Sequence, residues 1–237
     1  MRSGVVGLIG GMSWESSAEY YRLLNTEVRR RLGGHHNARS LMFTVDFAEI
    51  EELQRAGDWA AAGRVLAEAA RRLEAGGADV VLLCTNTMHK VADEIEAAVD
   101  VPFLHLVDVT ARRVREAGMR RVGLLGTRYT MEMPFYADRM AEWHGLELVV
   151  PDDPGRTLVH DVIYRELTQG RIRDASRDAY RRIIEDLAAQ GAEGVILGCT
   201  EITLLISPED SPLPVFDSTR IHVEAALDTV LRENPRI

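Results

Sequence analysis

The chain has 237 residues, of which 46% are hydrophobic and 27% are charged, and its formal net charge is −9. A soluble chain of this size can bury one large core or two smaller ones. The acidic balance argues against a nucleic-acid partner, because phosphate binding needs a basic face. Apolar runs are too short to span a membrane and residues 1–11 lack the apolar core of a signal peptide, so we expect a cytoplasmic protein with no membrane partner.

Cysteine and histidine usage argues against a metal site. The two cysteines, Cys84 and Cys199, suit a reducing compartment and offer no disulfide framework. Neither has a second cysteine at metal-ligand spacing, and the pair His35-His36 falls in a polar segment. We therefore expect no metal.

Three pairs of short apolar segments repeat along the chain in the same order. The first predicted strand, GVVGLIGG at 4–11, is echoed by RRVGLLGT at 120–127. The second, GADVVLLCTNTMHK at 77–90, is echoed by GAEGVILGCTEI at 191–202. A weaker echo links 101–110 with 213–219, each an apolar strand that follows a proline and ends at an acidic residue, Asp108 or Asp217. The order of these matches predicts two homologous halves.

Amphipathic helices are predicted between the strands. Residues 59–77 and 175–191 place apolar side chains at helical spacing, and both stretches end at glycine. Strands that alternate with such helices indicate an α/β fold with a short parallel sheet in each half. We expect a first domain of 1–100 plus 215–237 and a second domain of 101–214.

Ligands of open α/β sheets bind beyond the carboxyl ends of the strands. The segments at these ends are the Gly10-Gly11 turn, 84–89, 126–130 and 198–202, and we expect them to meet in a cleft between the halves. The Gly10-Gly11 pair lacks a dinucleotide-binding fingerprint and is read as a plain turn. His89 is a candidate cap or ligand, and the sequence does not decide between these roles.

The register of the second repeat decides which group can reach a ligand, because a slip of one residue turns a strand side chain to the other face. An ungapped alignment, with Val195 on Val81 (195 minus 81, an offset of 114), pairs Thr85 with Cys199. Cys84 pairs with Cys199 only if one residue is inserted. A cysteine at the end of an apolar strand is most often a small buried hydrophobe. We favour that reading for Cys84, and a chemical role for Cys199, since a thiol can act as an acid or a base.

Four segments resemble the aspartate/glutamate racemase superfamily, especially its aspartate racemases and the enterobacterial broad-specificity amino-acid racemases. They are GLIGGMSWESSAEYY at 7–21, LCTNTMHKVAD at 83–93, VGLLGTRYTME at 122–132 and ILGCTEI at 196–202. The resemblance implies two pseudo-symmetric Rossmann-like (flavodoxin-like) domains with the active site in the cleft. It also implies a homodimer that needs no cofactor, including no pyridoxal phosphate, and that racemises a small amino acid with two bases.

Both motifs of the family can be located in this chain. The family's second motif, Gly-Cys-Thr, stands intact as Gly198-Cys199-Thr200, whereas the first, Cys-Asn-Thr, reads Thr85-Asn86-Thr87. The resemblance assigns Cys199 to deprotonating the L-enantiomer and Thr85 to the opposite face, with Cys84 as the alternative. The expected substrate-binding residues are Met12, Asn86, Thr87, Thr127, Thr130, Thr200 and Glu201.

The substrate is less closely defined by the resemblance. Aspartate or glutamate is the nominal substrate, but Thr168 and Glu51 stand near the places of the family's lysine and arginine anchors. Nearby cations such as Arg39, Arg55 or Arg128 are possible substitutes. Neutral amino acids such as homoserine are therefore an alternative. Two further alternatives are a decarboxylase or isomerase that uses one thiol, and a protein that only binds small carboxylates.

Overall fold

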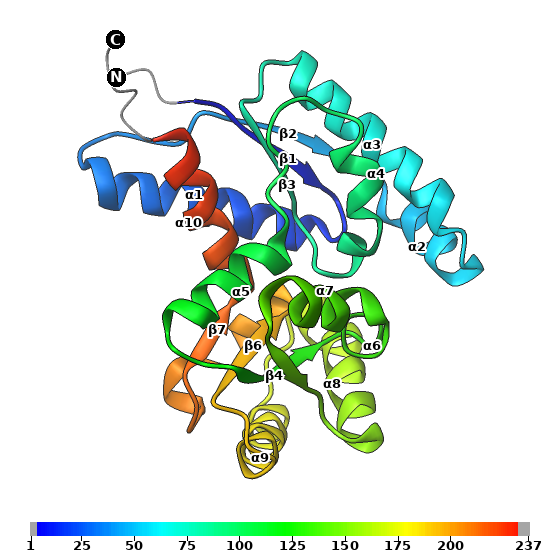
Figure 1. The fold of residues 1–237 in the computed structure, drawn as a ribbon, viewed down its shortest axis with the longest axis vertical. Helices are drawn as coiled ribbons and strands as arrows, with labels where there is room; N and C mark the ends of the chain where they lie inside the picture. The colour runs from blue at the N-terminus through cyan, green and yellow to red at the C-terminus, as the bar shows by residue number, and fades with distance from the viewer. Residues whose placement is uncertain (1–3, 232–237) are drawn as a thin grey trace. The chain divides into compact units, whose positions relative to one another are not determined.

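The computed structural model describes residues 4–231, and its backbone contacts divide the chain into two compact units. Of the described residues, the first unit contains 4–106 together with 222–231, and the second contains 107–221. The chain passes from one unit to the other at the start of helix α5 and within helix α10 (Figure 1). Each unit has its own sheet and is described by itself.

The first unit is built on a parallel sheet of three strands in the order β2-β1-β3. Its strands are β1 (Val6–Gly10), β2 (Ser40–Thr44) and β3 (Val80–Leu83). Its helices are α1 (Trp14–Leu32), α2 (Phe47–Ala56), α3 (Trp59–Ala75), α4 (Ala92–Glu96) and most of α10 (Ser218–Val230). A short 3-10 helix, η1 (Thr87–Val91), follows β3.

The side chains of β1 alternate between the two faces of the sheet and pack in two different hydrophobic cores. Leu8 packs in a cluster with Leu24 of α1 and Leu227 of α10. Ile9 points the other way, into a cluster with Leu66 of α3 and Ile95 of α4. Helices therefore cover both faces of the sheet, as Figure 1 shows, and β1 is buried along its whole length.

The turn after β1 requires glycine. Gly11 has a φ of +103°, and a Cβ atom there would lie 2.1 Å from the carbonyl oxygen of Val45. Its N–H donates to the Ser17 hydroxyl at 2.8 Å, which ties the turn to the first residues of α1. The following residue, Met12, is buried in the cluster that contains Ile9.

The second unit has a parallel sheet of four strands in the order β5-β4-β6-β7. Its strands are β4 (Arg121–Gly126), β5 (Glu147–Val149), β6 (Gly194–Gly198) and β7 (Val215–Asp217). Its helices are α5 (Leu106–Glu116), which starts at the last residue of the first unit, α6 (Arg128–Glu132), α7 (Pro134–His144), α8 (Asp153–Arg165) and α9 (Asp174–Ala189). Three 3-10 helices complete it: η2 (Leu167–Gln169), η3 (Thr200–Leu204) and η4 (Pro208–Asp210).

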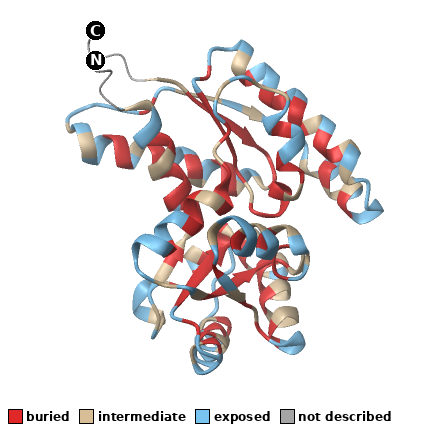
Figure 2. Ribbon diagram, viewed as in Figure 1, coloured by how far each residue is buried: buried red, intermediate tan, exposed pale blue. Residues whose placement is uncertain are grey.

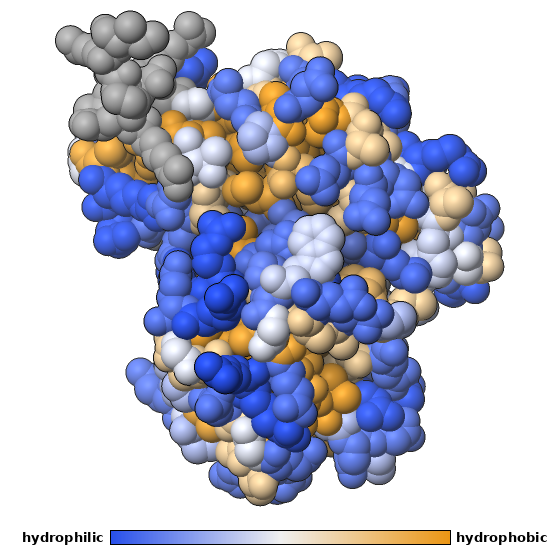
Figure 3. Space-filling view, in the orientation of Figure 1, coloured by the Kyte–Doolittle hydropathy of each residue, from blue (hydrophilic) through white to orange (hydrophobic). Residues whose placement is uncertain are grey.

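Apolar residues of β4 and β6 anchor two helices on one face of this second sheet. Leu125 and Leu197 pack with Val159 of α8 and Ile184 of α9. The central strands β1, β4 and β6, together with β3, are buried along nearly their whole length (Figure 2), whereas most of the face shown in Figure 3 is hydrophilic. Within residues 4–231, no helix is both long enough and apolar enough to cross a bilayer.

The expected fold class is confirmed, since short parallel sheets flanked by helices form both units. The strand predicted at 101–110, in the first copy of the third repeat, was wrong. In this segment only Phe103 makes a β-bridge, to Val81, and Asp108 lies in helix α5. The leucine and valine spacing after Pro102 suits a helix as well as a strand, and a short apolar run does not distinguish them. In its second copy, β7 pairs with β6 in the second unit, although 215–237 was expected in the first domain. The limits of the two domains otherwise stay a prediction.

Candidate functional site

Cys84 is part of the core of the first unit. Its side chain is fully buried in the cluster that contains Val6 and Leu82, and its backbone N–H donates to the carbonyl of Ile9 at 2.9 Å. Burial raises the pKa of the Cys84 thiol, because a thiolate would lose its hydration there. This thiol therefore behaves as a small neutral hydrophobe.

Thr85 is the first residue beyond the strand whose side chain is partly exposed. Its N–H donates to the carbonyl of Leu83 at 2.9 Å, so the chain turns immediately after β3. Asn86 and Thr87 follow as buried residues at the start of η1. Met12, which follows β1, belongs to the same edge of the sheet, because β1 and β3 are neighbours and Ile9 pairs with Leu83.

His89 binds the Thr85 turn with one ring nitrogen and the chain at Leu106 with the other. Its Nδ1 lies 2.7 Å from the carbonyl oxygen of Thr85, and its Nε2 lies 3.1 Å from the backbone nitrogen of Leu106. A backbone N–H can only donate, so Nε2 accepts and Nδ1–H donates to Thr85. Because Nε2 accepts and so carries no proton, these contacts hold the buried ring as one neutral tautomer.

His222 of α10 makes an equivalent pair of bonds. Its Nε2–H donates to the carbonyl of Leu104 at 2.7 Å, and its Nδ1 accepts from the Tyr20 hydroxyl at 2.9 Å. Its ring centroid lies 5.8 Å from that of His89, and the His89 ring lies 4.7 Å from that of His105. We call His89, His105, His222 and Tyr20 the histidine cluster.

Burial lowers the pKa of His222 to about 4, so we expect a stability change in a defined pH window. Because the folded pKa lies below the ordinary value near 6.5, the unfolded chain binds the proton first, and stability falls as pH drops from about 6.5 towards 4. The loss between pH 7 and pH 5 should be about 2 kcal/mol. Urea unfolding of the wild type and of His222→Gln at both pH values measures it, and equal losses in the two proteins would contradict the assignment.

In the second unit, Cys199 follows β6 with an extended backbone and a partly exposed side chain. Its Sγ–H donates to Oε2 of Glu201 at 2.9 Å. Burial, the negative charge of Glu201 and this hydrogen bond raise the pKa of the Cys199 thiol well above its usual range. The resting thiol is therefore protonated, with a carboxylate beside it that is placed to take its proton.

Several threonines lie on the same edge of the sheet as Cys199, because Gly126 pairs with Gly198. Thr200 shares a hydrogen bond with Thr219, with 3.1 Å between the hydroxyl oxygens. Thr127 caps α6 by accepting from the Thr130 N–H at 3.3 Å. A Cβ atom at Gly198 would lie 3.5 Å from the Thr130 methyl group, so Thr130 lies over the end of β6. Thr127, Thr130, Cys199, Thr200 and Glu201 are thus brought together within this unit.

Strand pairing gives independent support for the ungapped repeat. β1 and β4 correspond with Val6 on Val122, an offset of 116 (122 minus 6). Val6 pairs with Val80 in the first sheet, and Val122 pairs with Gly194 in the second, so β3 and β6 differ by 114 (194 minus 80). That register places Thr85 at the position of Cys199, and Cys84 at the position of Gly198.

Arg128 and Thr168, two of the residues considered as anchors of a substrate side chain or standing at an anchor's place, are engaged elsewhere. The Arg128 guanidinium forms ion pairs with Glu132 and Asp153 at 2.8 and 2.7 Å. The Thr168 hydroxyl donates to the carbonyl of Tyr164 in the preceding turn. Glu51 lies on α2. Within residues 4–231, no group of three or more His, Cys, Asp or Glu side chains is placed to hold a metal ion.

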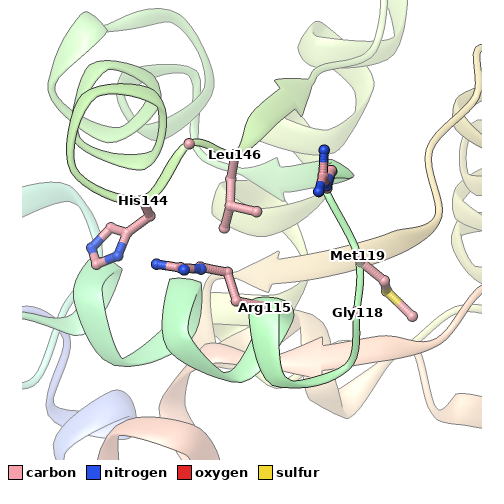
Figure 4. Close-up of a pocket in the computed structure, with 7 residues that line it drawn as sticks. Arg115, Gly118, Met119, His144 and Leu146 are labelled. Atoms are coloured by element: carbon pink, nitrogen blue, oxygen red, sulfur yellow. The ribbon is translucent and has the colours of Figure 1, made fainter.

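A separate hollow of about 400 Å³ opens on the second unit (Figure 4). Arg115 and His144 line it together with Met119 and Leu146, which precede β4 and β5. It therefore lies at the amino ends of the strands, whereas Cys199 lies at a carboxyl end. It contains none of the candidate site residues.

Sequence reasoning left the histidine cluster unassigned. His89 was undecided between two roles, and His222 is 133 positions away from it (222 minus 89), so no spacing pattern relates them. The neighbouring tyrosines at 20 and 21 did not indicate which of them joins the cluster. In the structure Tyr20 is buried, whereas Tyr21 is 53% exposed.

Comparison with known proteins relates the whole chain to racemases. A family model described as Asp/Glu/hydantoin racemase matches residues 9–226. A solved structure from Yersinia pestis, described as a candidate Asp/Glu racemase, is 53% identical with a TM-score of 0.91, covering 97% of this chain and 100% of that one. An aspartate racemase homologue from Pyrococcus horikoshii OT3 is 32% identical with a TM-score of 0.87 and the same coverage. The broad-specificity amino-acid racemase RacX of Bacillus subtilis is 26% identical over 168 residues, which is 71% of this chain and 72% of RacX. The chain therefore belongs to the Asp/Glu/hydantoin racemase family.

Proposed function

We propose that this protein is an amino-acid racemase that needs no cofactor and exchanges the α-proton through Cys199 and Thr85. The observation that carries the proposal is the Cys199 thiol hydrogen-bonded to Glu201 at the carboxyl end of β6, inside the Gly-Cys-Thr motif. Membership of the racemase family and the equivalent position of Thr85 support it.

The reaction needs a thiolate, and Glu201 provides a route to it. In the L-to-D direction, the thiol proton passes to the carboxylate, and Cys199 then takes the α-proton from the L-enantiomer. The electron pair left on Cα spreads into the substrate carboxylate, for which Asn86, Thr87 and Thr200 are the proposed donors. The Thr85 hydroxyl delivers a proton to the other face of Cα and is reprotonated from water, while Glu201 releases the proton it took from Cys199 to water, so that the resting enzyme is restored.

For the substrate, we favour broad specificity that includes neutral amino acids such as homoserine, with aspartate and glutamate as nominal members. A substrate side-chain carboxylate that is desolvated in a binding site needs a paired cation. Arg128 is already paired with two carboxylates, and Thr168 has no charge to offer. The similarity to RacX, a broad-specificity enzyme by name, supports the same view.

The test is proton NMR in deuterated buffer with the L- and D-forms of aspartate, glutamate and homoserine, while polarimetry follows inversion. Loss of the α-proton signal together with inversion is the expected result, and the substrate that reacts fastest defines the specificity. Carbon dioxide release from a disubstituted malonate without racemisation would favour a decarboxylase. Tight binding without exchange would favour a carboxylate-binding protein.

A further inference from the structure

We propose that His89 is a positioning residue for Thr85, and that it acts through the Thr85 carbonyl and through Leu106 as a fixed neutral imidazole. The inference rests on the proposed function in one respect, namely that Thr85 delivers a proton to substrate. Its structural part, that His89 holds the turn in place, stands on contacts within the first unit.

The Thr85 turn depends on this imidazole because the β-ladder has already ended. The last pairing of β3 with β1 joins Leu83 to Ile9, and Cys84 adds a bond to the Ile9 carbonyl. Beyond that point the Thr85 carbonyl accepts from His89 at 2.7 Å, and the His89 N–H donates back to the Asn86 carbonyl at 3.1 Å. One residue thus closes the turn with both its ring and its backbone.

The His89 ring cannot flip over without losing both of its hydrogen bonds. A flipped ring would place carbon atoms where Thr85 and Leu106 now have partners, and both backbone groups would lose a hydrogen bond. Phe103 and His105 pack against the ring, with centroids 5.8 and 4.7 Å from it, and fix its plane. The tautomer and the orientation are therefore set by the surroundings.

The expected effect is larger on the side of the reaction that Thr85 serves, although Asn86 and Thr87 of the same turn would hold the carboxylate of both enantiomers. Proton transfer is sensitive to displacements of an ångström or less, so a looser turn should slow the step made by Thr85. Cys199 is held through Glu201 in the second unit, and none of its hydrogen bonds involves His89. A general loss of folding would slow both steps equally.

Two substitutions separate the two ring contacts. In His89→Asn the side-chain amide can still donate to the Thr85 carbonyl from the position of Nδ1, whereas in His89→Gln the side-chain oxygen can still accept from Leu106 at the position of Nε2. We expect His89→Gln to slow deuterium exchange of D-substrates by about tenfold, the effect of one lost hydrogen bond. His89→Asn should stay within about threefold of wild type on this side. Exchange of L-substrates should stay within about threefold in both variants.

Equal losses on the L- and D-sides, or identical behaviour of the two variants, would overturn the proposal. Hydrogen–deuterium exchange of the protein itself gives a readout that needs no substrate. Peptides covering 84–88 should exchange faster in His89→Gln than in wild type, and should be unchanged in His89→Asn. If the wild type exchanges the α-proton of no amino acid, the proposed function fails. The hydrogen–deuterium exchange of the protein then tests the role of His89 by itself, and unchanged protection of 84–88 in His89→Gln would refute that role.

Discussion

Replacing Cys199 with alanine should abolish α-proton exchange from L-substrates, with a loss of about 10³-fold or more. Alanine removes the group that accepts the proton, and Glu201 then loses the thiol that donates to its Oε2 at 2.9 Å. Cys199→Ser keeps a hydroxyl in that place but is a far weaker base, so it should be nearly as impaired. NMR of the α-proton in deuterated buffer measures both variants.

The matched control is Cys84→Ala, the other cysteine of the chain. Cys84 is fully buried, and that burial raises the pKa of its thiol. Removing the thiol should therefore lower the stability of the protein but leave the rate of α-proton exchange unchanged. Complete loss of exchange in Cys84→Ala would show that the gapped register is the functional one. Retained exchange in Cys199→Ala would rule out Cys199 as the base.

The rate of L-exchange should also rise with pH through the alkaline range. The pKa of the Cys199 thiol lies above its usual range, so raising the pH increases the fraction of thiolate. The reactive form of the resting enzyme is therefore present at low population near neutrality. A substrate ammonium bound beside the thiol would oppose the charge of Glu201 and favour the thiolate.

The sequence correctly predicted the parts of the fold in which the local residue pattern agrees with the tertiary packing. The strands predicted at 4–11 and 120–127 are short and apolar, both strands end at a glycine, and both are central strands of their sheets. The ungapped alignment of the second repeat gave the same offset that strand pairing gives, because the insertion of a residue would disturb the register of a buried strand.

The sequence failed where the outcome depends on distant residues. Residues 101–110 read equally well as a strand or a helix, and only the packing of α5 decides. The role of His89 depends on Leu106 and on rings contributed by Phe103, His105 and His222, which no local pattern brings together. Such positions are specified by the folded structure and not by spacing.

Replacing Thr85 with valine should separate the two halves of the reaction. Valine keeps the shape of threonine but has no hydroxyl, so exchange of D-substrates and inversion should fall by about 10²-fold or more. Exchange of L-substrates should continue, because Cys199 can take and return a proton on its own face. Polarimetry and NMR on the same samples distinguish the two rates, and parallel loss of both would contradict the assignment of Thr85.

Thr85→Cys provides the opposite change at the same atom. A thiol with an ordinary pKa near 8.5 is a much better acid and base near neutral pH than a hydroxyl. Thr85 is partly exposed, so the new thiol would escape most of the burial that raises the pKa of Cys84 one residue earlier. We expect Thr85→Cys to speed exchange of D-substrates by about tenfold or more, since proton transfer at Thr85 is then no longer limited by a weak base. A slower D-side in Thr85→Cys, with Thr85→Ser unchanged, would instead mean that the hydroxyl serves to hold a water or the substrate.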